Sequence, residues 1–334
     1  MSVYPWQQEI WRSAQQLIKA DRLPHALLLS GPAGLGKLDF ARLLAQFLLC
    51  ENPTTEHACG HCQGCHLFAA GTHPDFQAIQ PEEEGKELTI GQIRELLSWQ
   101  TLTPQYGRAR VVIIEPADRM NQNAANALLK TLEEPAQNAL ILLVTAHSAS
   151  LLPTIRSRCQ QWSFAIPSRD ISLPWLAEQL TDKALAELTL AISDGAPLRA
   201  ASLARSGGLE LRTDLFADFE GFLQGKTEPV LLASQWLKLP LIEAFSTLHG
   251  WHVDMARLKI DVNTTQLNNP DLRKRLQVLS EQVDLTHLLQ RQVQLQEAMK
   301  RMRGHPNIQL LLEEMLLSWS SANEKLARRA TQMR

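Results

Sequence analysis

The pattern of apolar and polar residues divides the chain into a first half in which strands and helices alternate and a second half of helices alone. Five short apolar runs predict buried strands, at residues 26–30, 76–79, 111–114, 140–145 and 162–165. Between them, apolar residues recur with helical spacing near residues 43–48, 90–97 and 124–132. This alternation predicts an α/β domain with a parallel sheet that helices cover on both faces.

After about residue 167 the strands stop, and the sequence predicts a small helical unit over residues 171–205. The stretch 204–210 contains two glycines and predicts a linker. The rest should be helical, with two apolar helix faces formed by Leu285, Leu288, Leu289, Val293, Met299 and Met302, and by Ile308, Leu311, Leu312, Met315, Leu316 and Trp319. Such faces are typical of a helical bundle core, and an oligomerisation surface is the alternative.

Length and charge narrow the class of protein. The chain has 334 residues, enough for two or three domains, and a net charge of −2. This balance argues against a protein that binds nucleic acid alone through massed positive charge. The longest apolar run, residues 139–144, is far short of the roughly 20 residues that cross a bilayer, and no signal-peptide pattern is visible. We therefore expect a cytoplasmic protein without membrane contact, whose five cysteines are thiols or metal ligands.

A phosphate-binding loop with one defect follows the first predicted strand. Gly31, Gly36 and Lys37 meet the pattern G-x-x-x-x-G-K, and Gly34 lies inside the loop. Glycines let backbone N–H groups turn toward a phosphate, and the lysine would reach the terminal phosphates. The next residue is Leu38, where ATPases carry a hydroxyl that holds magnesium. The loop therefore indicates the fold but not catalysis: it either keeps its shape without nucleotide or binds nucleotide weakly.

The second half of an ATP site is expected where the third strand ends. Glu115 takes the place of the acid that holds magnesium through water, and Pro116 takes the place of the acid that activates the attacking water. A proline can accept no proton. Because phosphoryl transfer depends on placed charges, Leu38 and Pro116 together predict no significant ATPase activity for the chain alone.

The segment after the first helix carries four cysteines with the spacing C-x8-C-x2-C-x2-C: Cys50, Cys59, Cys62 and Cys65. Four thiolates at this spacing suit tetrahedral zinc, and the absence of an open ligand position predicts a structural role. An iron–sulfur cluster is the alternative. His57, His61 or His66 could each replace a thiolate, although four cysteines suffice. Cys159 stands apart and is expected to pack in the core.

Two arginines precede the last predicted strand. Arg156 and Arg158 flank Ser157, and the ordinary interpretation of such a pair is a solvated basic turn. Because the ATP site of this chain is incomplete, an arginine here could instead serve the site of a neighbouring subunit. An arginine donated in trans stabilises the charge of the transferring phosphoryl group and contributes a factor of about 10³–10⁵ in rate.

Five stretches in combination resemble the delta-prime subunits of the bacterial DNA polymerase III clamp loader, in the AAA+ superfamily. They are HALLLSGPAGLGK at 25–37, the four-cysteine insert, GTHPDF at 71–76, NALLKTLEEP at 126–135 and RSRC at 156–159. The resemblance covers essentially the whole length. It implies an AAA+ RecA-like domain over residues 1–166 with a zinc module at 50–65, a helical lid over 167–207, and a helical collar for oligomerisation over 208–334.

The resemblance also implies a function. The chain would join gamma or tau and delta subunits in a five-membered ring that loads the sliding clamp onto primer–template DNA at the nucleoid. It would be a non-hydrolysing component of the polymerase holoenzyme, and Arg158 would reach the ATP of the adjacent gamma subunit. Thr145 matches the sensor-1 position and Arg199 the sensor-2 arginine, so that Lys37 and Arg199 leave nucleotide contact open. The alternatives are an active motor subunit of the same loader and a zinc-dependent nucleic-acid-binding module.

Overall fold

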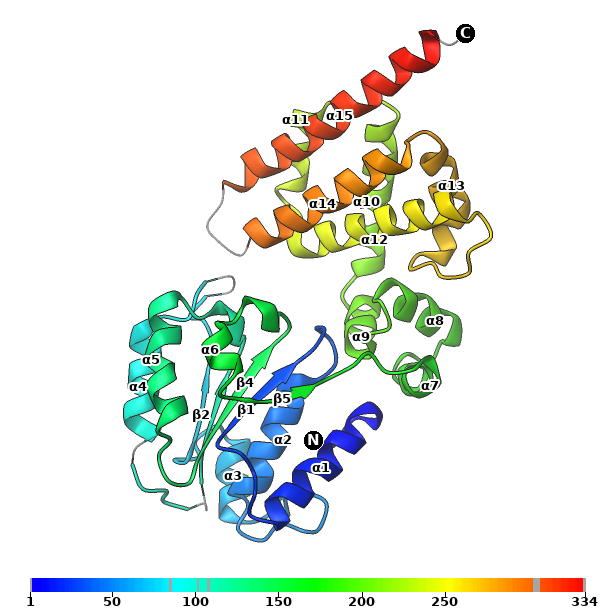
Figure 1. Cartoon of the computed structure of the whole chain (residues 1–334). Helices are drawn as coiled ribbons and strands as arrows, with labels where there is room; N and C mark the ends of the chain where they lie inside the picture. Colours follow the sequence, from blue (N-terminus) through cyan, green and yellow to red (C-terminus); the bar gives the residue numbers. More distant parts are fainter. Residues whose placement is uncertain (1, 84–85, 101, 107–108, 303–306, 333–334) are drawn as a thin grey trace. The chain divides into compact units, whose positions relative to one another are not determined.

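The structure is a computed structural model that describes residues 2–83, 86–100, 102–106, 109–302 and 307–332. The chain forms two compact units (Figure 1). The first consists of Met1–Trp175 with Ala196–Arg199, and the second of Leu176–Gly195 with Ala200–Arg334. The division into nucleotide-binding domain, lid and collar at residues 166 and 207 stays a prediction.

A five-stranded parallel sheet forms the centre of the first unit, with the strand order β2-β3-β4-β1-β5. The strands are β1 (Ala26–Ser30), β2 (Phe76–Ile79), β3 (Arg110–Ile114), β4 (Ala139–Thr145) and β5 (Gln160–Ser163). The last begins two residues earlier than expected. The three central strands are buried throughout. The expectation of five buried strands is wrong for β2 and β5, because edge strands pair on one side only and are partly exposed.

Helices cover both faces of this sheet, and the helices predicted near 43–48, 90–97 and 124–132 are confirmed (Figure 1). The covering helices are α1 (Gln8–Lys19), α2 (Lys37–Leu49), α4 (Ile90–Gln100), α5 (Gln122–Glu133) and α6 (Pro153–Arg156). Successive residues of a strand point to opposite faces. Leu27 and Leu29 therefore pack with α1 and α2 on one face. Leu28 packs with α4, α5 and α6 on the other face.

The strand register places the candidate ATP-site residues at one edge of the sheet. Ser30, the last residue of β1, pairs with Thr145, the last residue of β4. Ile114, the last residue of β3, pairs with Leu143. Because these strands are parallel, the loop after Ser30, the segment starting at Glu115 and the side chain of Thr145 all lie at the carboxyl edge of the sheet.

The second unit is helical. Its helices are α8 (Lys183–Ile192), α10 (Gly208–Leu223), α11 (Pro229–Trp236), α12 (Leu241–Ile260), α13 (Arg273–Glu281), α14 (Leu285–Arg301) and α15 (Ile308–Gln332), while α7 (Arg169–Leu180) and α9 (Pro197–Arg205) are divided between the two units. Trp236, Trp251 and Trp319 are fully buried in its core. Of the residues that the structure describes, none belongs to a helix that is long and apolar enough to cross a membrane.

Two sequence expectations in this unit are corrected. The linker predicted at 204–210 shrinks to two residues between α9 and α10, because Gly207 has a left-handed φ of 70° and turns the chain directly into the next helix. The apolar face predicted on α14 is wrong at Leu289 and Val293, which are 47% and 53% exposed. The buried face contains Arg291 instead, whose Nη2 donates to the Trp319 carbonyl at 3.0 Å. The face predicted on α15 is confirmed.

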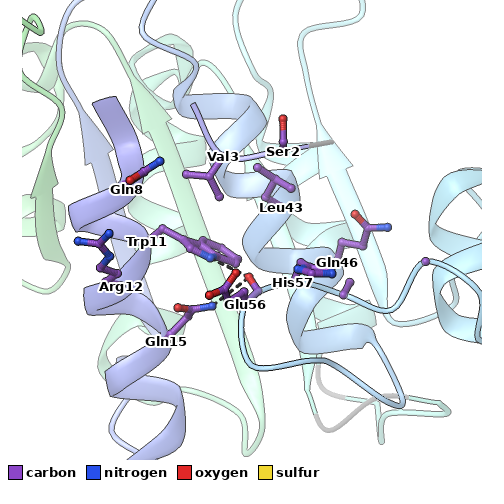
Figure 2. Close-up of a pocket in the computed structure, with 12 residues that line it drawn as sticks. Ser2, Val3, Gln8, Trp11, Arg12, Gln15, Leu43, Gln46, Glu56 and His57 are labelled. Carbon is purple, nitrogen blue, oxygen red and sulfur yellow. Dashed lines mark hydrogen bonds between the residues drawn. The ribbon is translucent and has the colours of Figure 1, made fainter. Parts of the chain in front are cut away.

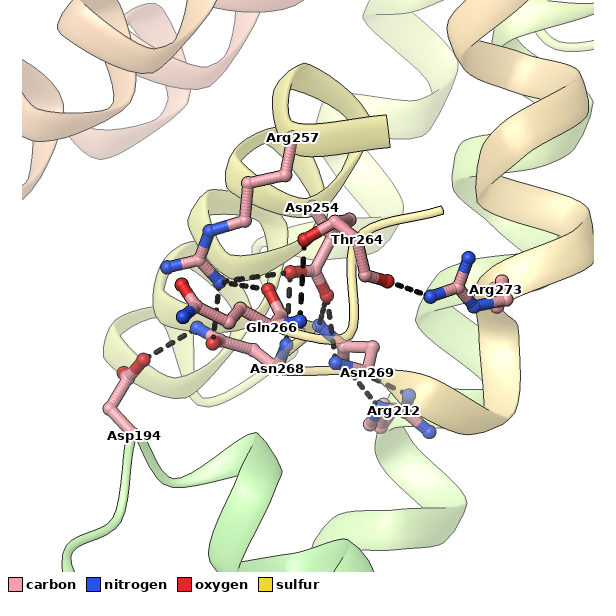
Figure 3. Close-up of polar contacts among 9 residues, drawn as sticks. All are labelled: Asp194, Arg212, Asp254, Arg257, Thr264, Gln266, Asn268, Asn269 and Arg273. Carbon is pink, nitrogen blue, oxygen red and sulfur yellow. Dashed lines mark hydrogen bonds and ion pairs between the residues drawn. The ribbon is translucent and has the colours of Figure 1, made fainter. Parts of the chain in front are cut away.

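A buried aspartate holds the segment that follows α12 (Figure 3). Asp254 is fully buried and accepts hydrogen bonds from the backbone N–H groups of Asn268 at 2.9 Å and Asn269 at 2.7 Å. The side-chain amide of Asn269 donates to the same carboxylate at 2.8 Å. Arg257 pairs with it at 3.4 Å, and Arg212 donates to the amide oxygen of Asn269. One carboxylate therefore fixes a segment that lacks regular structure.

We predict that Asp254→Ala lowers the free energy of unfolding by about 3 kcal/mol, because it leaves several buried donors without an acceptor. Urea denaturation followed by circular dichroism measures the loss. Asp214→Ala, at an exposed position of α10, is the control and should change stability by no more than about 0.5 kcal/mol. Equal losses in the two variants would contradict the prediction.

Candidate functional site

The phosphate loop joins β1 to α2, as the sequence predicts. Gly31, Gly34 and Gly36 have φ values of 143°, 77° and 75°, which other residues rarely adopt. A Cβ on Gly31 would lie 2.1 Å from the carbonyl oxygen of Phe164, and one on Gly34 would lie 2.7 Å from the Cβ of Arg199. The loop is therefore packed closely against the end of β5 and the start of α9. Arg199, predicted at the sensor-2 position, lies against it.

Lys37 folds back onto its own loop. Its ammonium donates to the carbonyl oxygens of Gly31 at 2.7 Å and Pro32 at 2.6 Å, and the residue is 7% exposed. Burial lowers the pKa of Lys37 to about 8, although the carboxylates of Glu115 and Asp118 act in the opposite direction. Two of the three donors that would reach a phosphate are thus occupied by the chain itself.

The N-terminal segment lies over the same loop. Gln7 is fully buried, and its side-chain amide donates to the carbonyl oxygens of Leu35 and Gly36, both at 2.8 Å. The indole N–H of Trp6 also donates to Leu35, at 3.0 Å. Leu38 packs against the apolar core that α1 and α2 share with the sheet. No short motif in the sequence identified Trp6 or Gln7, because single side-chain contacts over nearly thirty residues leave no periodic pattern.

The structure adds one carboxylate that the sequence analysis missed. Glu115 lies at the carboxyl edge of the sheet, directly after β3. Its Oε2 accepts a hydrogen bond from the side chain of Gln80 at 3.0 Å. Three residues later, Asp118 accepts a hydrogen bond from the hydroxyl of Thr145, the predicted sensor-1 residue. Thr145 is 1% exposed and also accepts the backbone N–H of His147 at 2.8 Å. The sequence could have indicated Asp118, because it is an acidic residue that follows Glu115 by about one helical turn.

Arg158 lies on the turn between α6 and β5 and not in the phosphate loop. Its Nη2 forms an ion pair with Glu133 at 2.6 Å, and its Nη1 donates to the Thr154 carbonyl at 3.0 Å. The side chain remains 35% exposed. The guanidinium is thus oriented by its own chain and still reaches solvent. Cys159, the next residue, is buried in the core as predicted, and burial raises the pKa of its thiol to about 11.

The four cysteines of the insert come together, as their spacing predicts. The Sγ atoms of Cys50, Cys59, Cys62 and Cys65 all lie within 4.8 Å of one another. Cys50 and Cys62 are separated by 3.8 Å, and Cys59 and Cys65 by 4.0 Å. Cys62 caps α3 (Gln63–Ala69), whose first turn carries Cys65. None of the three neighbouring histidines joins the cluster among the residues that the structure describes.

Backbone N–H groups point at these sulfur atoms. The N–H of Cys59 donates to the Sγ of Cys50 at 3.2 Å, and that of Cys62 to the Sγ of Cys59 at 3.3 Å. The N–H of Cys65 donates to the Sγ of Cys62 at 3.4 Å. Burial raises the pKa of Cys50 and of Cys65. At Cys62 burial acts in the same direction, but the N–H groups of Cys65 and Glu51 outweigh it and lower the pKa to about 6. Because the four sulfur atoms converge, the cluster could hold a metal ion through four sulfur ligands.

Comparison with known proteins gives matches to both units. Residues 6–168 match the family described as DNA polymerase III, delta subunit, and residues 206–321 match DNA polymerase III, delta subunit, C terminal. DNA polymerase III subunit delta' of Pseudomonas aeruginosa is 39% identical over 324 residues, which are 96% of this chain and 98% of the relative. The same subunit of Escherichia coli is 33% identical over 263 residues, 75% of this chain and 78% of the relative.

Among solved structures, a DNA polymerase III gamma subunit-related protein from Thermotoga maritima is 20% identical, with a TM-score of 0.42 over 94% of this chain and 99% of that one. The sequence relationship is much closer. A family match on each unit and a relative aligned over almost its full length lead to the same conclusion. The chain belongs to the delta-prime subunit family of DNA polymerase III.

Proposed function

We propose that the chain is a clamp-loader subunit that keeps the fold of an ATPase, hydrolyses no ATP itself and lends Arg158 to the ATP site of an adjacent subunit. Its partners would be gamma or tau and delta subunits, the sliding clamp and, through the complex, primer–template DNA. In this assignment residues 167–207 are the lid and 208–334 the collar. The names of the relatives support the subunit class. Identity of 38% over 145 residues to a Haemophilus influenzae tau/gamma subunit supports kinship with that subunit class.

The position of Lys37 carries the proposal that the chain does not hydrolyse ATP. A lysine that stabilises transferring phosphate must have its ammonium free to reach that phosphate. Here the ammonium is bonded to the carbonyls of Gly31 and Pro32. Leu38 is partly buried against the apolar core and offers no hydroxyl to magnesium. At the position of the second acid, Pro116 has no group that could activate water.

The surroundings of Arg158 support its role in trans. A finger must be accessible from outside its own subunit and held in a defined direction, since its effect depends on placed charge. Arg158 meets both conditions through its exposure and its contacts with Glu133 and Thr154. A surface ion pair of this kind is weak, so the guanidinium could leave Glu133 for a phosphate at little loss.

We propose zinc as the metal of the four-cysteine cluster, with Cys50, Cys59, Cys62 and Cys65 as ligands. Zn–S bonds of about 2.3 Å in a tetrahedron place sulfur atoms about 3.8 Å apart. The separations of 3.8 and 4.0 Å agree with that spacing. With four protein ligands no position remains for a substrate, so zinc would supply a cross-link that folds the insert, not a reaction.

We predict that the isolated chain hydrolyses ATP at background rate and that Lys37→Ala hydrolyses it no more slowly. The reason is that two of the three donors of the wild-type ammonium are bonded to Gly31 and Pro32, and that the positions of Leu38 and Pro116 supply neither a metal ligand nor a base. A steady-state assay with magnesium and ATP measures both proteins, and a gamma subunit is the positive control. A turnover in the wild type that Lys37→Ala abolishes would contradict the proposal.

We predict that Arg158→Ala leaves the assembled loader intact and lowers its DNA-stimulated ATPase. The rate of hydrolysis at the ATP site beside this subunit should fall by a factor of about 10³. The total ATPase rate of the ring should fall by the part that this site contributes. Size-exclusion chromatography checks assembly, and single-turnover hydrolysis measures the rate. Arg156→Ala, at the last residue of α6, is the control. Unchanged ring turnover in Arg158→Ala would exclude the finger.

We predict about one zinc ion per chain in the purified protein, since a closed four-thiolate site binds one metal ion. Cys62→Ser should lose most of the metal and unfold at lower urea, whereas Cys159→Ser should keep its metal because that thiol lies in a separate core. Elemental analysis by mass spectrometry measures the content. Iron in place of zinc, or full zinc content in Cys62→Ser, would exclude the assignment.

A further inference from the structure

One side of the N-terminal helix is bonded to the cysteine insert (Figure 2). The indole N–H of Trp11 donates to the carbonyl of Glu56 at 2.9 Å. The side-chain amide of Gln15 donates to the carbonyls of Thr55 and Glu56, both at 3.0 Å. Trp11 and Gln15 are 7% and 9% exposed, whereas Thr55 and Glu56 are exposed, so these bonds are partly buried. Both acceptors belong to the segment between Cys50 and Cys59, whose ends are cluster cysteines.

The same side of the helix is bonded to the phosphate loop. The 3-10 turn η1 (Pro5–Gln7) runs directly into α1, and Gln7 makes the two bonds to Leu35 and Gly36 described above. Gln7, Trp11 and Gln15 are spaced four residues apart, which aligns side chains along one helix face. Trp11 also packs edge-on against Phe40 and Phe47 of α2, with centroids 5.8 and 5.6 Å apart.

We infer that Gln7, Trp11 and Gln15 form a strut through which the cysteine insert holds the phosphate loop in the conformation in which Lys37 bonds to Gly31 and Pro32. The three residues are positioning residues, because they act on Lys37 and its loop through backbone carbonyls. The strut starts from a segment that the cluster fixes at both ends, so this inference rests on the proposed metal site for its anchored end. When the insert loosens, α1 loses three partly buried hydrogen bonds, and the loop loses the support that Gln7 transmits.

A second connection joins the insert to the phosphate loop. Helix α2 also leads from Lys37 directly to Cys50. A disturbance of the insert could therefore reach the loop along α2 without passing through α1. The two routes differ in one respect: only the strut requires the side-chain amide of Gln7.

The experiment measures amide hydrogen exchange by mass spectrometry in the full-length protein. Trp11→Phe combined with Gln15→Leu removes the three bonds to the insert and keeps apolar volume. We expect exchange at residues 33–40 to rise about tenfold, the effect of losing one net hydrogen bond's worth of stability. Exchange at residues 139–145 in β4 should not change. Gln8→Leu, at an exposed position of the same helix, is the matched control and should match the wild type.

Two further variants decide the route. Gln7→Leu alone should raise exchange at residues 33–40, and adding Trp11→Phe with Gln15→Leu to it should raise that exchange by less than about twofold. The strut is excluded if exchange at residues 54–58 rises while the loop stays at the wild-type rate. It is also excluded if the added substitutions have their full effect in the Gln7→Leu background, since α2 would then carry the signal.

A separate experiment tests the contribution of the metal. Removal by a chelator should raise exchange at residues 33–40 in the wild type and have less effect in Gln7→Leu. The metal content of every preparation is measured alongside. Protein that contains no metal, yet shows the full response to Trp11→Phe with Gln15→Leu, would overturn the metal site and leave the strut standing. A metal-loaded protein without that response would overturn the strut alone.

Discussion

The hydrogen bonds between the ammonium of Lys37 and the carbonyls of Gly31 and Pro32 are the interaction on which the proposed function depends. A buried cation needs partners, and a phosphate-binding loop normally leaves its lysine to find them in the nucleotide. Here the loop supplies them itself. Trp6 and Gln7 occupy further carbonyls of the loop, at Leu35 and Gly36. A phosphate would have to displace these bonds or use the one ammonium donor that remains.

Polar groups at the carboxyl edge of the sheet also have hydrogen-bond partners within the chain. This edge gathers Glu115, Asp118 and Thr145: Thr145 donates a hydrogen bond to Asp118, and Glu115 accepts one from Gln80. The chemistry proposed for the subunit lies instead at Arg158, on the turn before β5. A sheet whose central strands are fully buried is a firm base for such a turn. The proposed loss of ATP hydrolysis is therefore compatible with retention of the fold.

Local patterns in the sequence were enough to predict the parallel sheet and the cysteine cluster. Buried parallel strands appear as apolar runs, and the short spacing of Cys59, Cys62 and Cys65 restricts where their sulfur atoms can lie. The sequence could not show which side chains bond to distant backbone groups, and Gln7 and Asp118 act in that way. It also placed Leu289 on the buried face, because hydrophobicity alone does not anticipate an arginine such as Arg291 packed beneath a tryptophan. The role of Arg158 could be proposed from its motif, whereas only the structure shows its contact with Glu133.

The burial of Cys159 has a practical consequence. Alkylating reagents react with thiolates, and burial holds the pKa of this thiol at about 11, so that it stays protonated at neutral pH. It is also screened from solvent by the core around it. Cys159 should therefore not react in the folded chain, and any thiol that is modified there belongs to the insert. Mass added by such a reagent would count the sulfur atoms that a bound ion leaves unprotected.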